Sequence, residues 1–232
     1  MPRPSYNDFV RWRRRIAESL GSDRYSFLAL NELDRKLRRY IDYREGFFVE
    51  AGANDGLRQS NTYWFERFRG WRGVLVEGIP ALAAACRRNR PDARVFEIAL
   101  VADNSTASVT MQTAGLTSLV DGAFGSTDAD RAHLSRGAAV QSIPTSEIRE
   151  VAVRARTLTS VLAEVEPVRF DLLSLDVEGY EVSVLRGLDL DRFAPRFVLV
   201  EARDVSAIDD MLGSRYARID QFSHHDYLYK RT

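Results

Sequence analysis

The fold of this chain is decided by two neighbouring stretches, FFVEAGANDG at residues 47–56 and VLVE at residues 74–77. Each contains a short apolar run, which is typical of a strand buried in a parallel sheet. Gly52 and Gly56 follow the first run, and glycine lets a ligand approach the backbone closely. The two stretches therefore predict a nucleotide-type cofactor site at the end of a buried strand, with the acid Glu77 ending the next strand.

The dinucleotide fingerprint of nicotinamide enzymes is a competing interpretation of this loop. It requires the pattern G-x-G-x-x-G, and Asn54 stands where the second glycine should fall. An acid in the first strand, Gly-x-x-x-Gly and a second acid after the next strand instead form the pattern of S-adenosylmethionine sites in Rossmann-like methyltransferases. Backbone N–H groups would bind the cofactor's carboxylate, Glu77 would accept both ribose hydroxyls, and Glu50 would add negative potential near the ammonium and sulfonium groups.

Four motifs, taken in order, resemble the FkbM family of methyltransferases. They are EAGANDG at 50–56, SNTYWFE at 60–66, GWRGVLVE at 70–77 and SLDVEGYEVSVLRG at 174–187, and the similarity covers residues 46–202. The resemblance implies a class I S-adenosylmethionine fold and O-methylation of a hydroxyl on a sugar, glycan or polyketide-type metabolite. The family commonly has Pro directly after the second acid, whereas this chain has GIP at 78–80, so we expect a different loop on the adenosine side.

The pattern and the resemblance together assign a set of residues to the cofactor site. They are Glu50, Gly52, Ala53, Asn54, Asp55, Asn61, Thr62, Glu77, Ala99 and Asp176. Helix capping is a sufficient explanation of either Ser60 or Asn61. Ala99 ends the third predicted strand and by the family's pattern lies beside the adenine, although apolar packing explains it equally well.

Strands and helices alternate through the core of the sequence. We expect strands at 46–51, 73–77 and 94–99, with helices at 60–69 and 80–89 between them. This order implies a parallel sheet whose ligands bind beyond the carboxyl ends of the strands. Near the end of the chain, alternating segments at 216–219 and 226–230 suit a hairpin. The prediction is an α/β class I methyltransferase fold with a mainly parallel seven-stranded sheet and a terminal antiparallel hairpin.

Residues 1–45 are expected to form a helical extension of a methyltransferase domain at 46–232. Apolar residues recur at helical spacing from Phe9 to Leu20 and again from Phe27 to Ile41. We expect both helices to pack on the domain or on a partner, including a second copy of the chain. The arginine run at 11–15 could touch an acidic ligand or a membrane surface, but a solvated face explains most such runs.

The segment at 113–150 is rich in Gly, Ser, Thr and Asp and makes the connection around it unusually long. We interpret it as a mobile lid or an acceptor-binding insertion, with a plain surface loop as the alternative. His133 lies within it and could contact the acceptor, although solvent exposure is the commoner state of one histidine in a polar segment.

Acids at strand ends indicate where the chemistry lies. The apolar runs at 170–176 and 197–201 end in Asp176 and Glu201, and Glu178 opens the next helix. An aliphatic hydroxyl has a pKa near ~15.7 against ~4 for a carboxylic acid, so forming the alkoxide first would cost about 16 kcal/mol. The proton therefore moves late, or a divalent metal or a histidine assists. We assign Asp176 and Glu201 as acceptor-side or Mg²⁺ residues, Glu178 as base or orienting group, and His225 as an assisting base.

The composition favours a single soluble enzyme domain. The chain has 232 residues, of which 45% are hydrophobic, enough to bury a substantial core. Lys+Arg and Asp+Glu balance at 33 each, which disfavours a nucleic-acid substrate. The single cysteine, Cys86, suits packing. No apolar run reaches the ~18 residues of a membrane span, and the first residues lack the apolar core of a signal peptide. We therefore expect a cytoplasmic protein without stable membrane insertion.

Three classes of function remain open. An O-methyltransferase with a small-molecule or glycan acceptor is the first. An S-adenosylmethionine-binding protein without catalysis, or an assembly partner, is the second, and a nicotinamide oxidoreductase is a distant third. The sequence contains no metal-hydrolase helix, P-loop or nucleophile elbow that would favour another enzyme.

Overall fold

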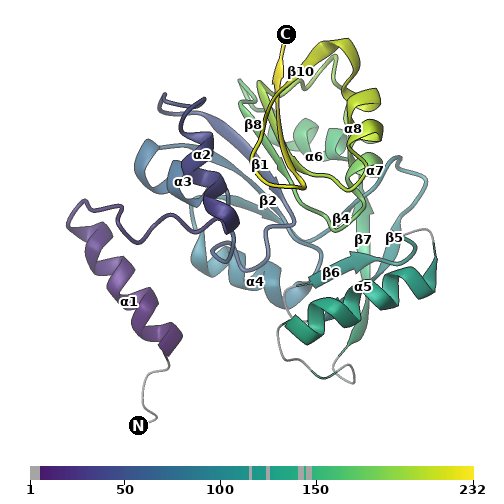
Figure 1. The fold of residues 1–232 in the computed structure, drawn as a ribbon, viewed down its shortest axis with the longest axis horizontal. Coiled ribbons are helices and arrows are strands. Elements are labelled where there is room, and N and C mark those ends of the chain that lie inside the picture. Colours follow the sequence, from purple (N-terminus) through teal and green to yellow (C-terminus); the bar gives the residue numbers. More distant parts are fainter. Residues whose placement is uncertain (1–5, 115–116, 124–125, 141–143, 145–147) are drawn as a thin grey trace.

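Seven strands form one sheet at the centre of the computed structural model, which describes residues 6–114, 117–123, 126–140, 144 and 148–232 (Figure 1). The strand order is β10-β11-β9-β8-β1-β2-β3. Their bounds are β1 Phe47–Ala51, β2 Arg72–Val76, β3 Arg94–Phe96, β8 Leu172–Leu175, β9 Phe197–Glu201, β10 Tyr216–Gln221 and β11 Asp226–Arg231. Strand β11 is antiparallel to both of its neighbours, and the other pairs are parallel. The predicted α/β fold, with a mainly parallel sheet and a terminal antiparallel hairpin, is confirmed.

Helices cover both faces of this sheet because successive strand residues point to opposite sides. Phe48 and Leu75 pack on the face covered by α2, α3 and α4, while Val49 and Val74 pack on the face covered by α6, α7 and α8. The bounds are α2 Leu33–Leu37, α3 Tyr63–Arg69, α4 Pro80–Asn89, α6 Leu158–Val165, α7 Glu181–Arg186 and α8 Val205–Leu212. Cys86 is fully buried in the first of these two cores, as predicted.

A second, smaller sheet lies beside the first and has the order β4-β7-β5-β6. Its strands are β4 Ala99–Leu100, β5 Ser108–Ala114, β6 Thr117–Val120 and β7 Arg149–Arg156. The prediction of one continuous strand at 94–99 is wrong, because two strands in different sheets form there. Strand β3 ends at Phe96, opposite Val76 at the end of β2, and the chain then crosses to pair Ala99 with Ala155 of β7.

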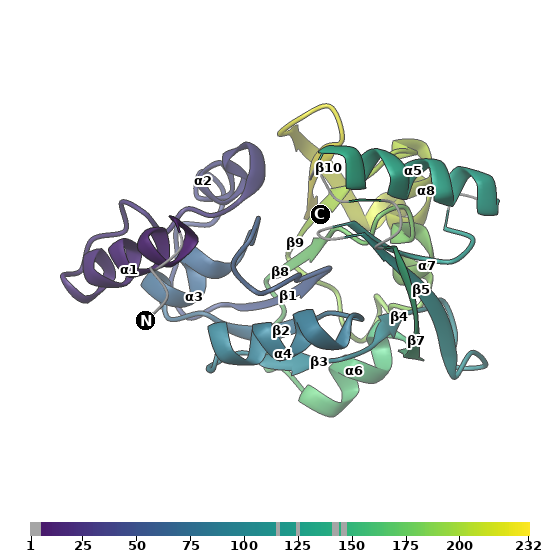
Figure 2. The same cartoon turned by 90° about the horizontal axis from the view of Figure 1, so that it is seen from below.

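Helix α5 (Thr127–Val140) packs on the second sheet, within the segment for which the sequence indicated no helix (Figure 2). Leu134 and Ala138 are its fully buried apolar residues and contact Leu119 of β6. Two buried apolar positions give too short an apolar face for the pattern to be visible in the sequence. Parts of the segment 113–150 lie outside the described residues.

The N-terminal region begins with α1 (Tyr6–Ser19), which confirms the first predicted helix and lies at the edge of the molecule (Figure 1). The second predicted helix, at 27–41, is mostly wrong. Only the 3-10 turn η1 (Leu30–Glu32) and α2 form there, because Asn31 and Glu32 adopt left-handed φ angles of 52° and 56°. Residues 1–5 of the predicted extension lie outside the described residues. No helix in the described ranges is both long and apolar enough to cross a membrane.

Candidate active site

The loop after β1 is fixed by a close contact between two strand ends. The backbone N–H of Gly52 donates to the carbonyl oxygen of Val76 at 3.0 Å. Gly52 has a φ of +82°, and a Cβ atom there would lie 1.7 Å from the carbonyl oxygen of Asp176. Only glycine fits. The ends of β1, β2 and β8 are thereby brought together at one point.

Glu77 follows β2 and is held by the backbone of this loop. Its Oε2 accepts from the N–H of Asn54 at 2.9 Å and its Oε1 from the N–H of Ile79 at 2.8 Å. Burial raises the pKa of Glu77 to about 7, although the backbone hydrogen bonds lower it. Each carboxylate oxygen has further lone pairs. Glu77 is therefore an orienting acceptor that titrates near neutral pH.

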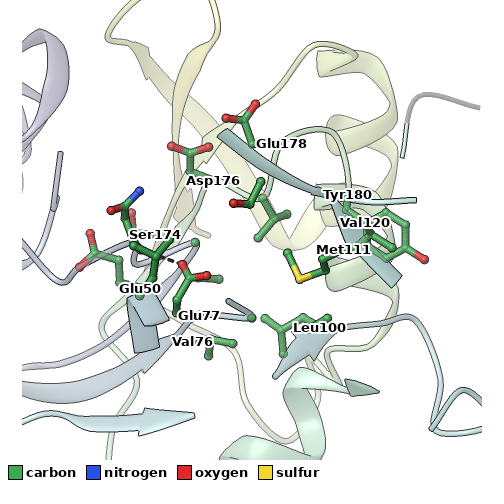
Figure 3. Close-up of a pocket in the computed structure, with 18 of the residues that line it drawn as sticks. Glu50, Val76, Glu77, Leu100, Met111, Val120, Ser174, Asp176, Glu178 and Tyr180 are labelled. Atoms are coloured by element: carbon green, nitrogen blue, oxygen red, sulfur yellow. Dashed lines mark hydrogen bonds between the residues drawn. The ribbon is translucent and has the colours of Figure 1, made fainter. Parts of the chain in front are cut away.

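A pocket lies beyond the carboxyl ends of β1, β2 and β8 and encloses about 920 Å³ counted out to its open mouth. In Figure 3, Glu50 and Ser174 lie on one side of it and Met111, Val120 and Tyr180 on the other. The polar residues that line it include Glu50, Asn54, Asn61, Glu77, Ser174, Asp176 and Glu178. The apolar wall is formed by Leu82, Ile98, Ala99, Leu100, Met111 and Val120. Both sheets therefore build the pocket.

Asn61 contributes an unsatisfied acceptor to the pocket wall. Its Nδ2 donates to Ser174 Oγ at 3.0 Å, whereas its Oδ1 is buried and has no hydrogen-bond partner among the described residues. A buried acceptor without a donor costs about 1–3 kcal/mol. A ligand that brings a donor to this position would remove that cost.

The carboxylate of Glu50 is hydrogen-bonded to residues 60–62, so it fixes this part of the chain and is not a free charge in the pocket. Its carboxylate accepts from Ser60 Oγ at 2.9 Å, from the N–H of Asn61 at 2.8 Å and from the hydroxyl of Thr62. The fully buried Arg90 lies 3.7 Å away and donates to Thr62 Oγ1 at 3.1 Å. Thr62 is therefore part of this network and does not line the pocket, contrary to its predicted place.

Two more predicted cofactor residues shape the loop instead of lining the pocket. Ala53 is 2% exposed and packs in the core beneath α3. The Oδ1 of Asp55 accepts from the N–H groups of Leu57 at 3.0 Å and Arg58 at 2.8 Å. Short polar side chains that bind their own backbone are common in turns, and this explains why the sequence pattern misplaced Asp55.

Asp176 and Glu201 end neighbouring strands and form an acid pair. The two carboxyl groups share a hydrogen bond, and Asp176 lines the pocket while Glu201 lies behind it. Burial, then the negative charges of Glu201 and Glu178, raise the pKa of Asp176 well above its usual value. Burial also raises the pKa of Glu201, while His225 and the bond from Asp176 lower it. Two carboxyl groups in hydrogen-bond contact favour holding one proton between them.

Glu178 contacts His133 and, through it, is linked to Arg203, and both residues are distant from it in the sequence. His133 of α5 places its Nε2 2.8 Å from Glu178 Oε2, and Arg203 places its Nη2 2.8 Å from His133 Nδ1. A guanidinium group can only donate, so the proton of the neutral imidazole lies on Nε2 and points to Glu178. Asp176 and Glu178 therefore bring two carboxyl groups to the same pocket, and the imidazole of His133 holds the second of them in place.

His225 lies on the far side of the acid pair. Its Nε2 is 3.9 Å from Glu201 Oε1 and 3.8 Å from Asp226 Oδ2, and among the described residues these three have ligand atoms close enough to hold a metal ion. Asp176, the other predicted metal ligand, is not in this group. None of the three lines the pocket. Mg²⁺ binding stays a prediction.

Sequence reasoning missed several residues of the pocket. Ser174 carried a signal, because it is a polar residue inside an otherwise apolar strand. Met111, Ser118 and Val120 carried none, since they reach the pocket only through the second sheet. His133 was noted but not assigned, and only the docking of α5 brings it to Glu178.

The order of the seven strands, the antiparallel β11 and the pocket beyond the strand ends define a class I methyltransferase fold. A family model described as the methyltransferase FkbM domain matches residues 50–229. The chain belongs to this family, which confirms the resemblance found in the sequence.

Three solved structures to which the chain is similar are distant from it in sequence. Methyltransferase FkbM from Methylobacillus flagellatus KT has 13% identity and a TM-score of 0.47 over 80% of this chain, and this chain spans 43% of its length. A TehB-like SAM-dependent methyltransferase from Corynebacterium glutamicum has 10% identity and a TM-score of 0.43, over 99% of this chain and 100% of its own. A Burkholderia thailandensis 1,6-didemethyltoxoflavin-N1-methyltransferase with S-adenosylhomocysteine bound has 13% identity and a TM-score of 0.40, over 100% and 92%. Curated proteins gave no match.

Proposed function

We propose that this chain is an S-adenosylmethionine-dependent O-methyltransferase that acts on a hydroxyl of a sugar, glycan or secondary metabolite. One observation carries the proposal. A single pocket combines an apolar wall, the buried acceptor Glu77 and, at its other end, the acids Asp176 and Glu178. Membership of a methyltransferase family supports the same activity.

The pocket residues fit the chemical groups of this cofactor. The apolar wall that includes Ala99 and Met111 suits the adenine, and the two oxygens of Glu77 suit the ribose hydroxyls. The unpartnered Oδ1 of Asn61 suits the ammonium group, because an amide oxygen without a donor can accept a hydrogen bond from an N–H group. When bound, the cofactor supplies a methyl group activated by a sulfonium cation.

Asp176 and Glu178 have different roles toward the acceptor. Asp176 lines the pocket and can hydrogen-bond to the acceptor through its carboxyl oxygens, which would orient the hydroxyl. Glu178, held in place by His133, can take the hydroxyl proton. Because forming the alkoxide first would cost about 16 kcal/mol, the proton moves to Glu178 only as the new bond to the methyl carbon forms.

Isothermal titration tests the cofactor first. S-adenosylhomocysteine is expected to bind with micromolar affinity, with or without EDTA, and NAD is expected not to bind. Asn61→Ala should weaken S-adenosylhomocysteine about tenfold and leave methylthioadenosine, which lacks the ammonium group, unaffected. Asn61→Asp keeps an oxygen acceptor and should retain the affinity. Binding of NAD alone would refute the proposal.

A panel of sugar, glycan and phenolic hydroxyls, with release of S-adenosylhomocysteine as the readout, then tests the transfer. Turnover on a hydroxyl but not on the matched deoxy or amino compounds is the expected result. Cofactor binding with no turnover on any hydroxyl would instead favour a binding protein or an assembly partner.

A further inference from the structure

Helix α1 and Leu20, the residue that follows it, carry large apolar side chains that are exposed. Phe9, Trp12, Ile16 and Leu20 recur every three or four residues and are 52%, 60%, 40% and 79% exposed. We call these four residues the α1 stripe. At this spacing they lie along one face of the helix. The stripe is the largest group of exposed large apolar side chains within the described part of the chain.

The opposite, polar face of α1 is the one that contacts the protein. Glu18 is 8% exposed, and its Oε1 accepts from Ser26 Oγ and from the hydroxyl of Tyr63, each at 2.8 Å. Arg11 adds an ion pair to Asp55 at 3.3 Å. A helix on the surface of a soluble domain normally buries its apolar face. The inverse orientation of α1 leaves the stripe available to something outside this chain.

Basic residues stand along both edges of the α1 stripe. With 100° between successive helical residues, Arg13 falls at one edge and Arg15 at the other, and both are exposed. Aromatic and aliphatic residues between basic edges are typical of helices that lie in the membrane interface.

A second copy of this chain fits the stripe poorly. Two α1 helices related by a two-fold axis can pack their stripes together in two ways. In an antiparallel pair, the Arg13 edge of one copy lies beside the Arg13 edge of the other. In a parallel pair, the Arg13 edge of one copy lies beside the Arg15 edge of the other. Either way a basic edge meets a basic edge, since both carry an arginine. An anionic surface complements both edges at once.

We propose that α1 docks flat on an anionic lipid surface, with the α1 stripe among the headgroups and Arg13 and Arg15 beside lipid phosphates. The helix does not span the membrane, in agreement with the absence of a spanning helix in the described ranges. The inference is independent of the methyl-transfer proposal, because none of these residues lines the pocket.

Vesicle co-sedimentation of the whole chain tests this proposal. Vesicles of phosphatidylcholine with phosphatidylglycerol should bind the protein at low salt, and binding should weaken as salt rises. Vesicles of phosphatidylcholine alone should bind it far less. The tryptophan emission should shift to the blue on binding. Since Trp64 and Trp71 are already buried, at 3% and 2% exposure, the shift reports on Trp12.

Variants locate the contact. Trp12→Glu with Ile16→Glu should abolish vesicle binding, and Arg13→Gln with Arg15→Gln should weaken it about 25-fold, at about fivefold for each arginine near an anionic surface. Val168→Glu is the matched control, because Val168 is fully exposed and apolar but lies outside α1, and it should bind like the wild type. Circular dichroism and S-adenosylhomocysteine titration check that each variant is folded.

Three outcomes would overturn the proposal. The first is no binding to the anionic vesicles, and the second is binding that survives Trp12→Glu with Ile16→Glu. The third is a dimer in sedimentation velocity that the same double variant dissociates, which would show that a second copy covers the stripe.

Discussion

Burial of the Glu77 carboxylate has a cost in stability, and we propose that the same group binds the cofactor; substitution by glutamine tests both points. The carboxylate is 6% exposed and accepts two backbone hydrogen bonds, from Asn54 and Ile79. Burial raises its pKa from 4.5 to about 7. The folded protein therefore binds this proton more tightly than the unfolded chain does, and the free energy of unfolding becomes dependent on pH.

The magnitude follows from the two pKa values. A difference of about 2.5 in pKa corresponds to about 3 kcal/mol, at about 1.36 kcal/mol for each unit. Because the folded-state pKa is the higher one, this contribution to stability is fully present below pH 4.5 and is lost as the pH rises through 7. Glutamine does not titrate, so Glu77→Gln should lack the contribution at every pH.

Urea denaturation of the wild type and of Glu77→Gln at about pH 4.5 and pH 8 measures this contribution of Glu77 to the free energy of unfolding. The wild type should lose about 3 kcal/mol more than the variant between the two pH values. The glutamine amide cannot accept both backbone hydrogen bonds, which lowers the stability of the variant by the same amount at both pH values. Comparing the two losses between about pH 4.5 and pH 8 removes this constant cost. Equal losses would refute the burial argument. In the same variant, S-adenosylhomocysteine should bind about tenfold or more weakly, since a charged acceptor for the ribose hydroxyls is gone.

Other substitutions test the rest of the site. Gly52→Ala should lower the free energy of unfolding by more than about 3 kcal/mol in urea melts, because its Cβ meets Asp176, whereas Gly21→Ala, at a similar φ with open space around it, should cost about 1 kcal/mol. Asp176→Ala should lower turnover about a hundredfold while titration shows S-adenosylhomocysteine affinity within a few fold; retained turnover would remove Asp176 from the mechanism. His133→Ala should lower turnover about tenfold with cofactor affinity unchanged, because Glu178 loses its donor, and the exposed His224→Ala is its control. Equal turnover of the two histidine variants would contradict this role.

The large sheet was predictable because its signals are local. Apolar runs of strand length, each followed by glycine or an acid, mark β1, β2, β8 and β9 in the sequence itself. The same signals found Gly52, Glu77 and Asp176, since strand ends in a parallel sheet converge wherever the ligand binds.

The rest of the site depends on contacts that are distant in the sequence. The sequence predicts Thr62 and Asp55 as ligand-binding residues because they are polar and lie near the loop after the first strand. Residue type alone does not show whether such a side chain points to a ligand or to the backbone. Met111 reaches the pocket through strand pairing with β7, and His133 through a helix with only a short apolar face. No local pattern encodes either placement.

The crossing from β3 to β4 has a consequence for engineering. Leu100 pairs with Arg156, and the N–H of Val101 donates to the carbonyl oxygen of Arg156 at 3.1 Å, so the segment between them leaves and re-enters the fold at adjacent points. That segment supplies Met111 and Val120 to the pocket and His133 to Glu178. Segments from relatives can therefore be transplanted at these two junctions while the seven-stranded scaffold keeps its own strand pairing. Such an exchange would replace one wall of the pocket together with the partner of Glu178, and would leave Glu77 and the loop after β1 in place.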